Sequence, residues 1–70
     1  MNYTVIYEQG ETSWSAYLPD LPGCVAVGRT RKEVEKLIRG AIEMHLEAMR
    51  RDGDPIPPPR TYAGNVAIAA

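Results

Sequence analysis

The spacing of apolar positions changes near residue 30 of this chain. Before that point, short segments alternate between apolar and polar side chains, which is the two-residue period of β-strands. From Thr30 to Arg51 the apolar residues recur every three or four positions instead, as in one long amphipathic helix. We therefore predict a sheet followed by a helix that packs on it.

Three strands are predicted before the helix, from alternation and from β-branched and aromatic content. They are expected at residues 2–8, 12–18 and 24–28. A polar loop with a glycine, residues 9–11, joins the first two strands as a hairpin. Pro19 ends the second strand because proline has no N–H for the ladder, and the proline- and glycine-containing segment 19–23 leads to the third.

Alternation also sorts the strand side chains into two faces. Trp14 and Tyr17 fall on opposite faces of the second strand, and Val25 and Val27 fall on the face opposite Cys24 in the third. A single helix covers only one face of a three-stranded sheet. The other face would keep exposed apolar groups, which favours partner binding or self-association.

The helix carries signals at both ends. Thr30 followed by Glu33 fits a capping box, and Gly53 followed by Pro55 is typical of a helix stop. The apolar stripe that we expect to face the sheet comprises Val34, Leu37, Ile38, Ala41, Ile42, Ala48 and Met49.

The end of the chain has a different composition. Residues 54–60 hold four prolines around Ile56 and predict an extended, polyproline-like connector. In residues 61–70 a weak alternation of apolar positions allows a short fourth strand, which can pair with the sheet edge of another chain. The fold class is thus α+β, a three-stranded antiparallel sheet with one helix on one face, in a single domain over residues 1–70.

Small size limits what this domain can do alone. At 70 residues a single core seldom supplies more than ~3–5 kcal/mol. One cysteine permits no internal disulfide, and no Cys/His cluster suggests a structural metal. We expect oligomerisation, as a dimer or a larger assembly, or a bound partner. With no signal segment and no apolar run of membrane-spanning length, a cytoplasmic location is expected, and no membrane partner.

The net charge of −1 argues against a dedicated nucleic-acid binder. Arg29, Arg31 and Lys32 form a small basic cluster, but solvated surface is the simpler interpretation. Direct DNA binding is therefore not expected.

Two segments together resemble the HicB-like antitoxins. They are D-L-P-G-C at residues 20–24 and D-G-D-P-I-P-P-P at residues 52–59, directly after the helix, and the similarity extends from Tyr3 to about Ile68. The resemblance implies a β-β-β-α-β fold that is a degraded form of ribonuclease H, without the acidic cluster that binds catalytic metal. It also implies that the chain neutralises a HicA-type RNA-cleaving toxin by masking the toxin's active site.

Many members of that family carry a C-terminal DNA-binding module, and the present sequence ends at Ala70, before any such module. Autorepression through DNA is thus not expected. An alternative within the same family is an orphan, self-associating domain with no toxin partner.

Partner-binding residues are predicted in and around the stretch from Tyr17 to Cys24, and on the sheet face away from the helix. Aromatic side chains dominate interface energetics. The candidates are Trp14, Tyr17, Asp20, Leu21 and Cys24.

Catalytic chemistry has few candidates. His45, the single histidine, lies near the middle of the apolar stripe with no second ligand or nucleophile spaced for it, so a half-buried structural role is favoured over a catalytic one. Cys24 is better explained as a small buried hydrophobe than as a nucleophile. A residual nuclease would depend on Glu8 or Asp20, but carboxylates do not converge from several strands. We predict no catalytic residue, no cofactor and no metal.

Overall fold

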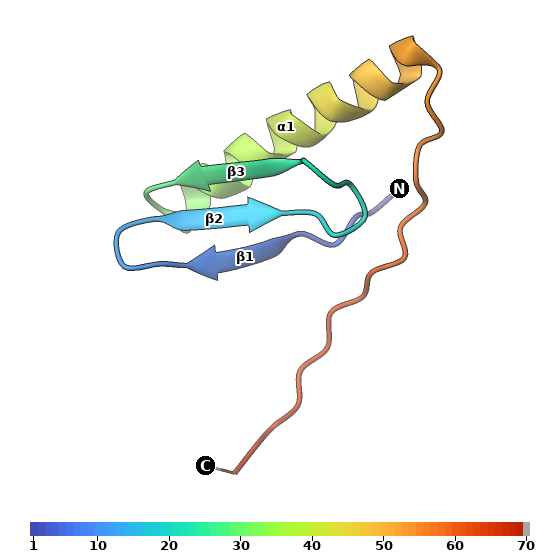
Figure 1. Ribbon diagram of the computed structural model, residues 1–70. Helices are drawn as coiled ribbons and strands as arrows, with labels where there is room; N and C mark the ends of the chain where they lie inside the picture. The colour runs from blue at the N-terminus through green and yellow to red at the C-terminus, as the bar shows by residue number, and fades with distance from the viewer. Residues whose placement is uncertain (70) are drawn as a thin grey trace.

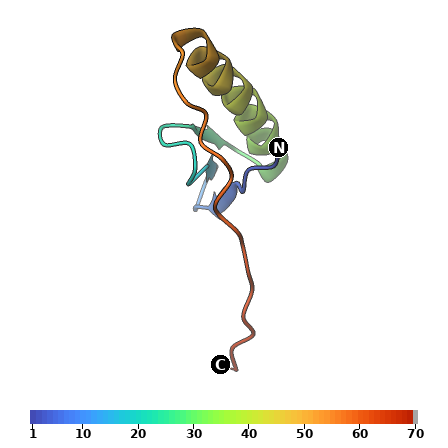
Figure 2. The same cartoon turned by 90° about the vertical axis from the view of Figure 1, so that its right-hand side faces the viewer.

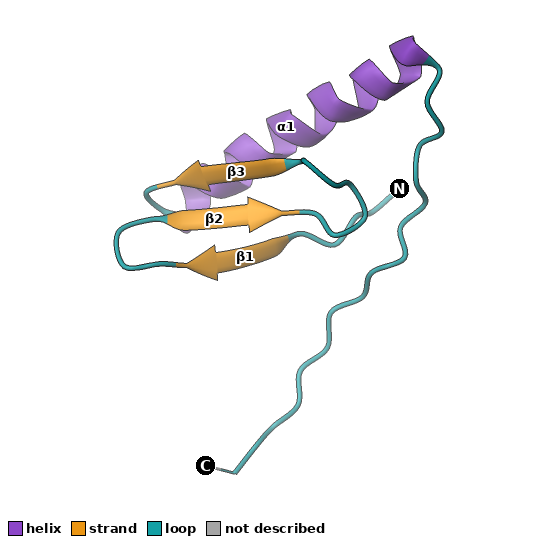
Figure 3. Cartoon of the chain, viewed as in Figure 1, coloured by secondary structure: helices purple, strands orange, loops and turns teal. Residues whose placement is uncertain are grey.

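The computed structural model describes residues 1–69 as a three-stranded sheet backed by one helix. The elements are β1 (Ile6–Gln9), β2 (Trp14–Tyr17), β3 (Val25–Gly28) and α1 (Arg31–Asp52) (Figure 1). This order confirms the predicted α+β class and β-β-β-α arrangement. Figure 3 shows the helix lying across one side of the sheet only. The likeness to ribonuclease H stays a prediction.

The sheet is antiparallel, with strand order β1-β2-β3. Each strand has four residues. β2 and β3 lie within the predicted segments, whereas β1 begins four residues later than predicted and includes Gln9, which was assigned to the loop. At Leu18 the chain has left the β1–β2 ladder, and its N–H donates to the Cys24 carbonyl at 3.4 Å. The connector 19–23 is thereby closed into a compact loop.

Local signals set the helix bounds as predicted. The Thr30 hydroxyl accepts a hydrogen bond from the Glu33 N–H at 3.1 Å, while the Glu33 carboxylate accepts from the Arg29 N–H at 3.2 Å. The second bond thus reaches one residue further back than in a standard capping box. Gly53 ends the helix in the left-handed region, with φ of 74°, which an L-residue with a Cβ adopts only at a cost.

The core forms where α1 crosses β2 and β3 and where the 19–23 loop folds beneath the helix. Six side chains are buried there: Ala16, Leu18, Leu21, Cys24, Val34 and Ile38. Around them, the half-buried apolar residues include Leu46 and Met49, near the C-terminal end of the helix. A 22-residue helix spans about 33 Å, far more than a four-residue strand. The loop and the connector therefore pack under the half of the helix that overhangs the sheet.

The predicted stripe on α1 is mostly confirmed, with one error. Leu37 is 47% exposed, whereas its neighbour Ile38 is buried. Leu46, which was not predicted, packs against the core instead. The stripe is centred on Val34 and Ile38, so Leu37 falls beyond its edge, on the side where no strand or loop covers the helix.

After α1, the chain runs back past the open end of the sheet and then leaves the body of the molecule (Figures 1 and 2). Residues 54–60 contain no helix or strand and run as an extended segment. The fourth strand that the sequence allowed over residues 61–70 is not formed within 61–69, because no other strand lies beside that segment to make a ladder. Ala70 is outside the described residues.

Candidate partner-binding surface

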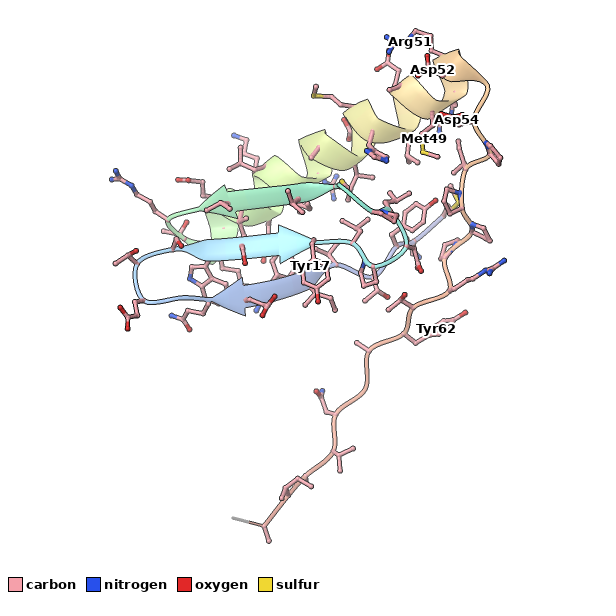
Figure 4. All side chains as sticks on the ribbon, in the orientation of Figure 1. Tyr17, Met49, Arg51, Asp52, Asp54 and Tyr62 are labelled. Carbon is pink, nitrogen blue, oxygen red and sulfur yellow. The ribbon has the colours of Figure 1, made fainter. Side chains whose placement is uncertain are left out.

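The face of the sheet opposite α1 carries an exposed apolar patch. The strand register aligns Ile6 with Tyr17 and Val25, and in the next row it aligns Ser15 with Val27. Tyr17 is 39% exposed, Val25 63% and Val27 64%. Figure 4 shows Tyr17 on the near side of the sheet, with α1 behind it. We call Ile6, Ser15, Tyr17, Val25 and Val27 the uncovered face.

The sequence builds this face by simple alternation. Trp14 and Ala16 point from β2 toward α1, so Ser15 and Tyr17 point the other way. Cross-strand neighbours on one face lie within side-chain contact distance, so the two rows form a continuous surface. Glu8, aligned with Ser15, adds one carboxylate at the β1 side. The surface is thus mainly apolar with an acidic margin, which suits a protein partner.

The five predicted partner-binding residues are divided between the two sides of the sheet. Tyr17 lies on the uncovered face, whereas Trp14 is half-buried on the helix side. Leu21 and Cys24 are buried in the core, 1% and 3% exposed. Asp20 is half-buried at the connector. Of the five, Tyr17 presents the largest exposed side chain to a partner, and Leu21 and Cys24 can act only by shaping the loop.

Asp20 has a structural partner within the chain. One carboxylate oxygen accepts hydrogen bonds from the backbone N–H groups of Arg60 and Thr61, at 2.8 and 3.0 Å. The other oxygen accepts from the Thr61 hydroxyl at 2.8 Å. The bond from the Arg60 N–H is the main reason that the pKa of Asp20 lies below its ordinary value of 3.8. Asp20 therefore fastens the connector to the 19–23 loop, and we call this contact the Asp20 clamp.

Cys24 and His45, the two candidates for a nucleophile and an acid–base group, lie close together, and no hydrogen bond joins their side chains. Cys24 and His45 both line a shallow groove with Val25 and Met44. Burial raises the pKa of the Cys24 thiol, so at neutral pH it stays protonated and unreactive. This confirms the interpretation of Cys24 as a buried hydrophobe, and it confirms that His45 is half-buried.

Arg31 lies in the first turn of α1, where its positive charge is repelled by the positive end of the helix dipole. Two contacts hold its side chain. Its guanidinium lies 4.9 Å from the centre of the Tyr7 ring and donates to the Glu35 carboxylate at 3.1 Å. Cation–π and i,i+4 contacts of this kind offset the repulsion from the helix dipole. Arg31 is thereby engaged on the helix side of the sheet, away from the uncovered face.

Within residues 1–69, no three His, Cys, Asp or Glu side chains come together as a metal site. In the same part of the chain no helix is both long and apolar enough to cross a membrane. The uncovered face is an exposed apolar surface that suits recognition of a partner. Alternation predicted that face, although Ile6 and the two valines were not singled out as partner-binding residues.

Comparison with known proteins agrees with the motifs at residues 20–24 and 52–59. A family model described as the HicB-like antitoxin of bacterial toxin–antitoxin systems matches residues 3–68. The chain belongs to the HicB-like antitoxin family. Membership points to an antitoxin role in a toxin–antitoxin system, with a toxin as the kind of partner, and to a role without catalysis.

Curated relatives include short and long proteins. A UPF0150 protein of Thermoplasma acidophilum is 36% identical over the whole of both chains. Another UPF0150 protein, from Synechocystis, is 35% identical over 80% of this chain and 72% of its own length. Antitoxin HicB 2 of Photorhabdus laumondii is 33% identical over 87% of this chain, which spans only 44% of that antitoxin. No solved structure gave a significant match.

Proposed function

We propose that this HicB-like domain neutralises a HicA-type RNA-cleaving toxin by docking its uncovered face over the toxin's active site. The observation that carries the proposal is the aligned apolar row of Ile6, Tyr17 and Val25, with the exposed Val27 in the next row, left open on the face opposite α1. Family membership supplies the kind of partner.

The proposed mechanism is masking, which needs no chemistry from this chain. Aromatic and branched side chains on a rigid sheet lose little conformational freedom on binding, and their burial excludes water from the contact. Glu8, at the margin of the face, is placed to meet the positive charge that a surface binding RNA phosphates must carry. Docking here would deny RNA access to the toxin.

The test is co-expression with the product of the adjacent gene, followed by an RNA-cleavage assay with and without this protein. Val25→Asp places a charge within the proposed contact and should weaken toxin binding by about 30-fold or more, the effect of losing one interface hot spot. Leu37→Asp is the matched control, because Leu37 is also an exposed apolar residue but lies on α1, outside the groove that Val25 and Met44 both line. We expect the Leu37 variant to inhibit cleavage as well as the unmodified protein does.

The opposite pattern, with binding lost in the Leu37 variant and kept in the Val25 variant, would move the interface to the helix. If the adjacent gene encodes no such toxin, or its product does not bind, the alternative is the orphan domain. In that case the uncovered face would pack against the same face of a second chain, since an apolar surface suits a second copy as well as a toxin. Val25→Asp would then halve the mass of the purified protein in solution.

A further inference from the structure

A second unpaired feature lies at the β1 edge of the sheet. β1 pairs with β2 on one side only, so the backbone groups on its outer side have no ladder partner among the described residues. α1 packs mainly on β3 and β2, so β1 is the strand that the helix covers least. An open strand edge of this kind readily accepts a strand from another chain.

A groove runs along this edge, between β1 and the helix. It has a volume of about 510 Å³. Val5 and Tyr7 form its wall on the sheet side, and Ile38 and Ile42 form the wall on the helix side. Its rim carries the charged side chains of Lys32, Glu35, Lys36 and Arg39. A strand added beside β1, about 4.8 Å away, would place every second side chain in this groove.

The same chain carries a segment of the right character. Residues 62–69 are extended, and none of them is charged. Tyr62, Val66 and Ile68 occupy alternate positions on one side of the segment and are 86%, 82% and 76% exposed. Figure 4 shows Tyr62 pointing away from the body of the molecule. A lone extended segment with exposed apolar groups is not stable in water without a partner strand.

Hydrogen bonds to the rest of the chain hold Thr61, the residue directly before this segment. The Asp20 clamp holds Thr61, and the Thr4 hydroxyl donates to the Thr61 carbonyl at 2.5 Å. Further back, the Tyr3 hydroxyl donates to the Pro57 carbonyl. Beyond Thr61 the chain diverges from β1 in both views (Figures 1 and 2). The segment is thus anchored at its root and directed away from the groove of its own chain.

We propose that residues 62–69 of one chain add as a strand to the β1 edge of a second copy, with Tyr62, Val66 and Ile68 in that copy's groove, and that the exchange is reciprocal. Because each chain carries both the donor strand and the acceptor edge, two such contacts close a symmetric dimer and leave no free edge at β1. The neutral segment enters an apolar groove without removing a charge from water. The contact goes beyond toxin binding and uses a different surface, so the uncovered face stays available.

The first experiment measures mass in solution by sedimentation equilibrium. The unmodified protein should have the mass of two chains. The double variant Val66→Asp with Ile68→Asp should raise the dimer dissociation constant by about 100-fold, roughly tenfold for each apolar side chain lost. Ala67→Asp is the matched control, since Ala67 lies between the two on the opposite side of the segment and should leave the dimer intact. All three positions are remote from the core, so these variants keep the fold.

The second experiment distinguishes exchange from internal pairing. Chains labelled with carbon-13 are mixed with unlabelled chains of the unmodified protein, and NMR is filtered for contacts between the two. Contacts from the Val66 and Ile68 methyl groups to Val5 and Ile42 should appear between chains. A single-chain mass, contacts found only within one chain, or equal dissociation by the Ala67 variant would each overturn the proposal. Val25→Asp leaves the exchange intact, so failure here is distinct from failure of toxin binding.

Discussion

Ala16 and Tyr17 are neighbours on β2, and Cys24 directly precedes Val25, the first residue of β3. Ala16 and Cys24 face α1, whereas Tyr17 and Val25 lie on the other face of the sheet. The first pair is buried under α1 and the second is exposed to solvent. Both faces are apolar enough to drive association. Burial of the covered face stabilises the folded chain. The apolar area of the uncovered face stays in contact with water, so its burial can stabilise a complex with a partner. The difference depends on the helix, which covers one face and not the other.

The largest effect is expected where the helix meets the covered face. Ile38→Ala removes a buried side chain from a small core and should lower the free energy of unfolding by about 2–5 kcal/mol. Leu37→Ala, at the adjacent exposed position, should change it by no more than about 0.5 kcal/mol. Urea denaturation followed by circular dichroism measures both. Equal losses would mean that α1 is rotated relative to the sheet.

A smaller effect is expected from polarity on the two faces. Cys24→Ser places a hydroxyl in the buried apolar site and should cost about 1–3 kcal/mol of unfolding free energy. Val27→Thr makes a similar change on the uncovered face, where water serves the hydroxyl, and should stay within about 0.5 kcal/mol. Thermal denaturation of the two variants compares the faces directly. A Val27 variant as unstable as the Cys24 variant would show that the uncovered face is already buried, for example against a second copy.

The smallest effect is confined to the connector. The pKa of Asp20 is lowered by its hydrogen bonds to Arg60 and Thr61, so the clamp is fully formed above pH 3.8 and is lost as the pH falls below that value, through the lowered pKa. NMR signals of the Arg60 and Thr61 amides should shift in that acid range, while the Ile38 amide signal does not. Asp20→Asn should abolish the titration. A midpoint above 3.8 would contradict the assigned hydrogen bonds.

Prediction from the sequence succeeded best where structure depends on near neighbours. The helix bounds were predicted because Thr30, Glu33 and Gly53 act within one turn of the helix ends. The two-faced sheet followed from alternation, since the pleat fixes side-chain direction at every residue. The family resemblance followed from two short motifs. For the partner-binding surface, the sequence indicated the face and Tyr17, but not the register that aligns Tyr17 with Ile6 and Val25.

Only the tertiary structure decided the rest. The Asp20 clamp joins residues 41 positions apart, and no local pattern predicts that a loop carboxylate will meet the Thr61 amide. The same holds for Leu37, which periodicity placed on the stripe but which no strand or loop covers. Residues 61–69 alternate as a strand does, yet a strand exists only when another backbone lies beside it to share hydrogen bonds. The sequence by itself determined which side chains are apolar enough to be buried. Which of them are buried was decided by the packing of α1, because one helix covers only one face of the three short strands.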